Sequence, residues 1–138
     1  MKLKWTCLLA LSVSLVAVSG CVETVDGRHR AGVPFADDRV EGRYERTPLE
    51  LWTAAMDVLK HQGSLTSQDT LKNVLEASVD ERHIWVKVEE FDSKISRVIV
   101  QARTKAGGAD KDMAAFIDKQ IAVRLAAGNL TPAAPVHR

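Results

Sequence analysis

The stretch "LEASVDERHIWVKVEEFDSKISRVIVQAR", Leu75 to Arg103, decides the fold because apolar residues recur in it at every second position. They are Leu75, Ala77 and Val79, then Ile84, Val86 and Val88, then Val98, Val100 and Ala102. Alternation of this kind is typical of strands that bury one face. The three runs are separated by short polar segments, Asp80–Arg82 and Asp92–Lys94, which are long enough only for hairpin turns. The stretch therefore predicts an antiparallel meander.

Helical patterns lie on both sides of this stretch. The segment "TPLELWTAAMDVLKHQG" has Thr47 as a candidate cap, Glu50 to complete a capping box, and Gly63 as a natural end. A second apolar stripe at helical spacing begins after Asp110, which can also cap, and ends at Gly128. We expect one helix before the meander and one after it.

These elements have a simple joint solution, because two amphipathic helices can cover the apolar face of one sheet. Shorter strands are expected at Glu41–Glu45, before the first helix, and at Ser64–Gln68, after it. The predicted fold class is α+β. It is a two-layer sandwich in which an antiparallel meander sheet of four to five strands carries two helices on one face, in the order strand, helix, strands, helix. Residues 41–128 form this single small domain.

The N-terminus has the features of a secretory signal: basic Lys2 and Lys4, then a mostly apolar run too short to span a bilayer, which takes about 20 residues. The run ends in "VSGC", residues 18–21, which resembles the lipobox of bacterial lipoproteins. In that family the cysteine thiol is lipidated, the chain is cut before it, and the new amino terminus is acylated. The resemblance implies that residues 1–20 are removed and that Cys21 carries the lipid. The alternative is an ordinary cleavage site followed by a chance cysteine.

The same resemblance predicts a location in the bacterial cell envelope. In enteric bacteria, aspartate after the lipidated cysteine retains a lipoprotein in the inner membrane, and this chain has Val22 there. We expect the periplasmic face of the outer membrane. The other cysteine, Cys7, lies within the signal, so no disulfide is expected in the mature chain.

Charge and composition describe the parts outside the domain. The chain has 19 basic and 18 acidic residues, a balance that gives no basic footprint for nucleic acid. Residues 21–40 are polar and contain glycine and proline, which predicts a flexible tether with a reach of about 25 Å. Residues 129–138, "NLTPAAPVHR", are expected to be a disordered tail.

From Arg43 to Leu125 the chain resembles a family of small bacterial lipoproteins known only as a domain of unknown function. The resemblance lies in the order of elements, in a last strand such as "VIVQAR", and in a final helix with spaced isoleucines. Members often have Arg-x-Gly and a helix serine where this chain has Gln101-Ala102-Arg103 and Ala114. The resemblance implies an envelope protein of the same architecture. Because the family's function is uncharacterised, it implies no site residues.

Catalytic and metal-binding patterns are weak. His61, Ser64 and Asp69 are the residue types of a hydrolase triad, but no nucleophile-elbow glycines flank the serine. Asp57 and His61 lie one helical turn apart, and two ligands do not make a metal site. The remaining histidines, His29, His83 and His137, belong to no ligand motif. We expect no cofactor and no enzyme; the alternative is a small-ligand binder or cryptic hydrolase using a cleft between helices and sheet.

The face of the sheet away from the helices is the candidate functional surface. It should present large apolar groups framed by arginines on an open sheet, a pattern typical of docking surfaces. The expected interaction patch consists of Trp85, Phe91, Arg97, Ile99 and Arg103. We predict a non-enzymatic module that binds an envelope protein or envelope component there. The alternative is that the tether or the tail folds over this face.

Overall fold

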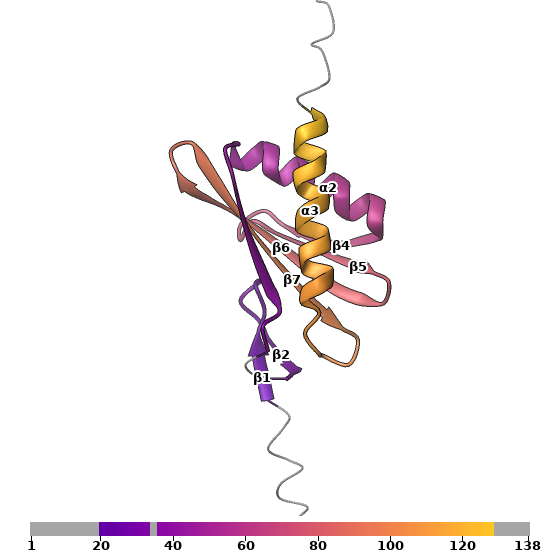
Figure 1. Cartoon of the computed structure of the whole chain (residues 1–138). Coiled ribbons are helices and arrows are strands. Elements are labelled where there is room, and N and C mark those ends of the chain that lie inside the picture. Colours follow the sequence, from indigo (N-terminus) through magenta and orange to yellow (C-terminus); the bar gives the residue numbers. More distant parts are fainter. Residues whose placement is uncertain (1–19, 34–35, 129–138) are drawn as a thin grey trace, which may run out of the picture.

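The computed structural model describes residues 20–33 and 36–128 (Figure 1). The predicted signal, apart from Gly20, and the predicted tail at residues 129–138 lie outside the described residues. In chain order the elements are β1 (Gly20–Glu23), β2 (His29–Gly32), β3 (Arg39–Tyr44), α2 (Pro48–Gln62), β4 (Ser64–Asp69), β5 (Val74–Val79), β6 (Arg82–Asp92), β7 (Ile95–Thr104) and α3 (Lys111–Gly128).

The main sheet has five antiparallel strands in the order β3-β7-β6-β5-β4. Strands β4 to β7 form the predicted meander, and β3 joins the free edge of β7. Helices α2 and α3 lie together on one side of this sheet (Figure 1). The α+β prediction, with two helices on one face of a meander sheet, is confirmed.

The core lies between the sheet and the helices. Residues that face each other across antiparallel strands share a face of the sheet. Ile84 lies opposite Ala102, and Val86 lies opposite Val100, so the alternating apolar residues line up across β6 and β7. All four are fully buried, and α2 and α3 add Leu51, Leu59 and Ile117 to the same cluster. The period-two pattern of the sequence therefore predicts the buried face correctly.

Both helix starts follow the predicted caps. The backbone N–H of Glu50 donates to Thr47 Oγ1 at 3.3 Å, and the backbone N–H of Thr47 donates to Glu50 Oε2 at 2.9 Å, which is the reciprocal capping box. At α3, the backbone N–H of Met113 donates to Asp110 Oδ1 at 3.0 Å. These bonds satisfy backbone donors that have no partner within a helix.

Helix α3 is also tied to the edge strand β3. The Tyr44 hydroxyl donates to Asp118 Oδ1 at 2.8 Å. Burial, together with the hydrogen bond to Asp118, raises the pKa of the Tyr44 hydroxyl. Gly42 leaves room for this approach, because a Cβ there would collide with the Asp118 carboxylate and the Tyr44 ring.

The predicted tether is wrong for residues 21–32, and also for Arg39 and Val40, which begin β3. Strands β1 and β2 pair as a two-stranded antiparallel hairpin, here called the N-terminal hairpin, with Cys21 opposite Ala31 and Val22 opposite Arg30. Its turn is closed by a hydrogen bond from the backbone N–H of Gly27 to the carbonyl of Thr24, and Gly27 has a φ of 77°, which favours glycine. Four-residue strands of mixed polarity carry too little period-two signal to be recognised in the sequence.

In the part of the chain that the structure describes, neither helix combines the length and the apolar character required to cross a bilayer.

Candidate functional site

The outer face of the sheet is the face that the helices leave free. Across β5, β6 and β7, Glu76 lies opposite Trp85, and Trp85 lies opposite Gln101. Further along β7, Ile99 pairs with Lys87 and with Glu41 of β3. The N-terminal hairpin divides this face into two parts. We call the part beneath it, with Trp85, Gln101 and Arg103, the covered half, and the part beyond it, with Arg43, Phe91, Arg97 and Ile99, the open half.

Trp85 and Arg103 are not exposed, contrary to the prediction. Trp85 is 3% exposed and Arg103 is 5% exposed. The Arg30 guanidinium of the hairpin lies over the indole ring of Trp85, 5.1 Å from its centroid, and the His83 ring stacks beside it. The prediction fails because the segment expected to be a tether packs on this half of the face. Trp85 and Arg103 are therefore removed from the candidate docking patch.

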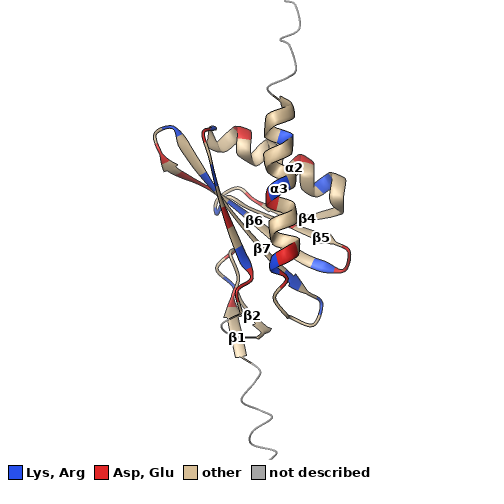
Figure 2. Ribbon diagram, in the orientation of Figure 1, with Lys and Arg blue, Asp and Glu red and all other residues tan. Residues whose placement is uncertain are grey.

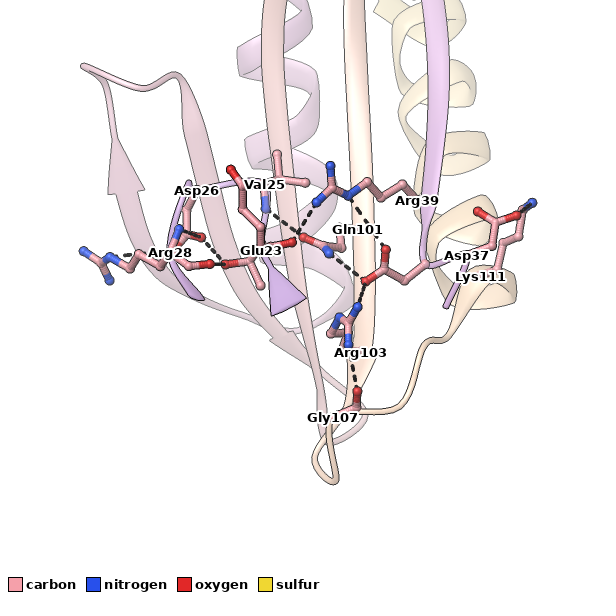
Figure 3. A network of polar contacts seen from close by, with 12 residues as sticks. Glu23, Val25, Asp26, Arg28, Asp37, Arg39, Gln101, Arg103, Gly107 and Lys111 are labelled. Carbon is pink, nitrogen blue, oxygen red and sulfur yellow. Dashed lines mark hydrogen bonds and ion pairs between the residues drawn. The ribbon is translucent and has the colours of Figure 1, made fainter. Parts of the chain in front are cut away.

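A buried polar network joins the hairpin to the sheet beneath it (Figure 3). The Gln101 side chain donates from Nε2 to Asp38 Oδ2 at 2.6 Å and accepts at Oε1 from the backbone N–H of Val25 at 2.8 Å. Arg103 pairs through Nη2 with the same Asp38 oxygen at 2.5 Å and donates from Nη1 to the carbonyl of Gly107 at 2.9 Å. These contacts hold the hairpin and the sheet in one arrangement. Arg103 Nε is buried without a hydrogen-bond partner among the described residues.

The hairpin turn has its own buried acid. Burial opposes ionisation of Asp26, but hydrogen bonds from Thr24, Arg28 and Arg30 outweigh it and lower the pKa of the Asp26 carboxyl. The carbonyl of Asp26 accepts a bond from Lys72 Nζ at 2.9 Å, which links the turn to the β4–β5 connection.

The open half keeps three members of the predicted patch together, namely Phe91, Arg97 and Ile99. Phe91 is 46% exposed. The guanidinium groups of Arg43 and Arg97 lie 4.1 Å and 5.7 Å from its ring centroid. Arg43 comes from the edge strand β3, whereas Phe91 lies on β6, and β7 separates these two strands. No pattern in the sequence indicated that Arg43 would reach Phe91.

Carboxylates hold the Arg97 side chain in place. Arg97 Nε donates to Glu89 Oε2 at 3.1 Å, and its Nη1 lies 3.6 Å from Glu41. Hydrogen bonds from Lys87 and Arg97 lower the pKa of the Glu89 carboxyl. Arg43 is held in the same way, because its Nε donates to Glu41 Oε1 at 3.0 Å. The open half is thus an aromatic ring beside two guanidinium groups, each of them paired with a carboxylate. Aromatic and arginine side chains are the groups enriched in protein interfaces.

Charge gives no comparable signal. Over the described residues, basic and acidic positions are interspersed along the sheet and both helices rather than gathered on one side (Figure 2). The outer face repeats this pattern, since Arg97 lies opposite Glu89 on β6 and forms an ion pair with Glu41 on β3. The feature that distinguishes the open half is therefore Phe91 with its two arginines and not a net charge.

The candidate hydrolase residues are not brought together. Ser64 is the first and Asp69 the last residue of β4, and a six-residue strand separates its ends by about 17 Å. The Asp69 carboxylate instead accepts the backbone N–H groups of Leu71 and Lys72, both at 3.0 Å, and so forms the turn after β4. These three residues cannot act as a triad in this arrangement.

The candidate metal ligands have other roles. Asp57 Oδ2 accepts a bond from Arg124 Nη2 at 3.0 Å, which joins α2 to α3. Among residues 20–33 and 36–128, no group of three or more potential ligands comes together. Asp57 and His61 line a groove of about 520 Å³ between the two helices. This groove lies between the helices, whereas the alternative hypothesis of a ligand binder or hydrolase required a cleft between helices and sheet.

Cys21, the predicted lipidation site, is an exposed free cysteine on β1. It lines a shallow depression with Asp37, Asp38 and Arg39, at the end of the molecule where the hairpin opens. No protein-family model matches the chain, and comparison with curated proteins finds no matching relative. The resemblance to bacterial lipoproteins stays a prediction from residues 18–21 and from the order of elements.

Proposed function

We propose that this chain is a lipid-anchored protein of the bacterial cell envelope, held through Cys21 at the periplasmic face of the outer membrane. Its domain is a non-enzymatic module that binds an envelope protein through the open half of the sheet. The signal features, the "VSGC" sequence at residues 18–21 and the exposure of Cys21 support the anchor. The geometry around Phe91 supports the binding role.

The observation that carries the binding role is the half-exposed Phe91 ring with the guanidinium groups of Arg43 and Arg97 against it. The Arg43 guanidinium covers part of this ring, and Phe91 is still 46% exposed. Full burial of a phenylalanine side chain contributes about 1.5–3 kcal/mol, so a partner that completes the burial gains a useful part of that free energy. The two guanidinium groups supply directed hydrogen bonds at the rim of the same contact.

The test is photocrosslinking in cells, with a photoreactive amino acid at position 91 of the full-length protein. Lys119, which is exposed on α3 away from the sheet, supplies the control position. We expect a discrete adduct with one envelope protein from position 91 alone. Background labelling at both positions, or equal adducts from both, would contradict the binding role.

A further inference from the structure

We propose that the N-terminal hairpin mounts the domain directly on the membrane, with the loop of residues 105–108 facing the bilayer and the β6–β7 turn pointing away from it. This inference rests on the proposed lipid on Cys21. The domain then has a fixed orientation relative to the membrane and does not move freely at the end of a flexible tether. The partner of this surface is a lipid bilayer, because the surface is continuous with the residue that carries the lipid.

There is no spacer between the anchor residue and the folded structure. Cys21 is exposed, but the next residue, Val22, is 8% exposed and packs within the hairpin. One residue extends the chain by at most about 3.6 Å, whereas a free tether over residues 21–40 has a reach of about 25 Å. A lipid on Cys21 therefore brings the domain itself to the headgroups.

The hairpin is held to the domain at several separate points, so it cannot act as a hinge. Arg39 of β3 donates from Nη2 to the carbonyl of Glu23 at 2.7 Å. On β5, Glu76 lies 3.6 Å from Arg30 Nη2. The bonds from Gln101 to Val25 and from Lys72 to Asp26 add contacts with β7 and with the β4–β5 connection. Attachments to four parts of the sheet fix both the position and the direction of the hairpin.

The hairpin also places a second segment beside Cys21. A Cβ on Gly32 would lie 2.5 Å from Arg103 Nη1 and 3.0 Å from the Gly107 carbonyl, so β2 and the β7–α3 loop are in close contact there. At this end of the molecule Val33 is 46% exposed, and Lys105 and Ala106 are exposed on the loop. Apolar side chains can enter the headgroup boundary, and a lysine can meet lipid phosphates.

The opposite end of the molecule is the end that carries Phe91. Strand β7 runs from Ile95 to Thr104, and ten residues of strand span about 30 Å. The β6–β7 turn therefore lies far from the hairpin, at the other end of the sheet (Figure 1). With the hairpin end on the membrane, the open half points into the periplasm, where a partner protein can reach it.

The test uses the lipidated full-length protein in phosphatidylcholine–phosphatidylglycerol vesicles that contain a lipid with a nitroxide-labelled headgroup. Lys105→Cys and Lys94→Cys form a matched pair, because both lysines are exposed and flank β7. Once Cys21 is a thioether and Cys7 is removed with the signal, the new cysteine is the single free thiol for a fluorophore. We expect several-fold stronger quenching at position 105 than at position 94. Equal quenching at both positions, or none at either, overturns the fixed orientation.

A second pair of variants tests the role of the hairpin. Gly32→Leu forces a side chain into the contact with Arg103 and Gly107, whereas Gly128→Leu adds one where no atom lies within 4 Å. Quenching at position 105 should fall to the level of position 94 in the first variant and stay unchanged in the second. Arg30→Ala serves as a milder substitute if Gly32→Leu does not fold. If quenching at position 105 stays strong in both hairpin variants, the hairpin does not orient the domain on the membrane and the proposal is overturned.

The mass of the purified protein separates failure of this inference from failure of the anchor. If the mass shows no acyl groups on Cys21, both the lipid anchor and the fixed orientation on the membrane are contradicted. If the protein is lipidated but quenching is equal at positions 94 and 105, the proposed lipid anchor stands and only the fixed orientation is overturned.

Discussion

Asp38 and Arg103 are a buried ion pair under the N-terminal hairpin, with side chains that are 5% and 6% exposed. Removing one partner of such a pair leaves the other charge buried without compensation. The neighbouring Asp37 also pairs with a base, Lys111, but these two side chains are 69% and 54% exposed. Two adjacent aspartates therefore have very different energetic roles.

We expect Asp38→Ala to lower the free energy of unfolding by about 3–5 kcal/mol, because it leaves Arg103 buried and unpaired. Asp37→Ala is the matched control and should cost no more than about 1 kcal/mol, as exposed ion pairs do. Urea unfolding of both variants measures the difference. Similar losses in the two variants would show that the burial of Asp38 has no energetic consequence.

Asp110 links pH to stability. The hydrogen bond from Arg82, together with the backbone N–H of Met113, lowers the pKa of the Asp110 carboxyl. The pKa of this carboxyl is lower in the folded state than in the unfolded state, where it is about 3.9. The ionised Asp110 therefore stabilises the fold fully when the pH is above the unfolded-state pKa, and this stabilisation is lost as the pH falls through the folded-state pKa. Asp110→Asn keeps an acceptor for the cap but loses the charge.

We therefore expect Asp110→Asn to cost up to about 1 kcal/mol at neutral pH, because the Arg82 and Asp110 side chains are partly exposed. The difference from the unaltered protein should shrink toward zero as the pH falls below the folded-state pKa of Asp110. Unfolding free energies measured across this acidic range test the expectation. A difference that does not change with pH would mean that the charge on Asp110 contributes nothing.

At the scale of elements, the contact between β3 and α3 depends on the absence of a side chain at position 42. We expect Gly42→Val to cost about 1–3 kcal/mol, since the added atoms collide with Asp118 and Tyr44. Gly128→Val is the control, because no atom lies within 4 Å of a Cβ there. Thermal unfolding measures both variants. A Gly42→Val protein as stable as its control would show that α3 can move away from β3 without loss.

The hairpin is an element whose docking can be followed through Trp85. Nε of Arg30 and Nε1 of Trp85 are buried without a hydrogen-bond partner among the described residues. Because unsatisfied buried donors cost free energy, we expect the contact between Arg30 and Trp85 to be sensitive to substitution. Arg30→Ala removes the cation–π contact, which contributes about 0.5–2 kcal/mol, and the ion pair with Glu76.

In a Trp52→Phe background, Trp85 is the remaining tryptophan of the chain after residues 1–20 are removed. We expect Arg30→Ala to shift its fluorescence to longer wavelength and to increase quenching by acrylamide. Arg28→Ala is the matched control, because the Arg28 side chain is 66% exposed and its pairing with Asp26 spans 3.7 Å. Unchanged emission in Arg30→Ala would show that the hairpin stays docked without Arg30.

For the whole molecule, folding and partner binding should be separable. Phe91→Ala removes a half-exposed ring and its contacts with Arg43 and Arg97, so we expect it to lower the free energy of unfolding by about 1 kcal/mol, while crosslinking from position 99 is lost. Leu51→Ala, in the fully buried core, should cost about 2–5 kcal/mol. Chemical denaturation and crosslinking of both variants make the comparison. Retained crosslinking in Phe91→Ala would remove Phe91 from the interaction surface.

Local patterns explain why much of the architecture could be predicted. The apolar face of β6 and β7 follows from alternation, and the starts of α2 and α3 follow from Thr47, Glu50 and Asp110. The candidate site was predicted only in part. Phe91, Arg97 and Ile99 lie together on the open half as expected, but the contribution of Arg43 depends on the pairing of β3 with β7, which has no local signal.

The sequence by itself determined the strands of the main sheet, the two helices and the buried face, because periods of two and of 3.6 residues, together with caps, act over a few residues. The tertiary structure decided which part of the outer face stays open. Val25 and Gln101 lie 76 positions apart, and their contact is one of several polar contacts that follow no period in the sequence. Because these contacts hold the hairpin over Trp85 and Arg103, the part of the candidate patch that stays accessible is the part around Phe91.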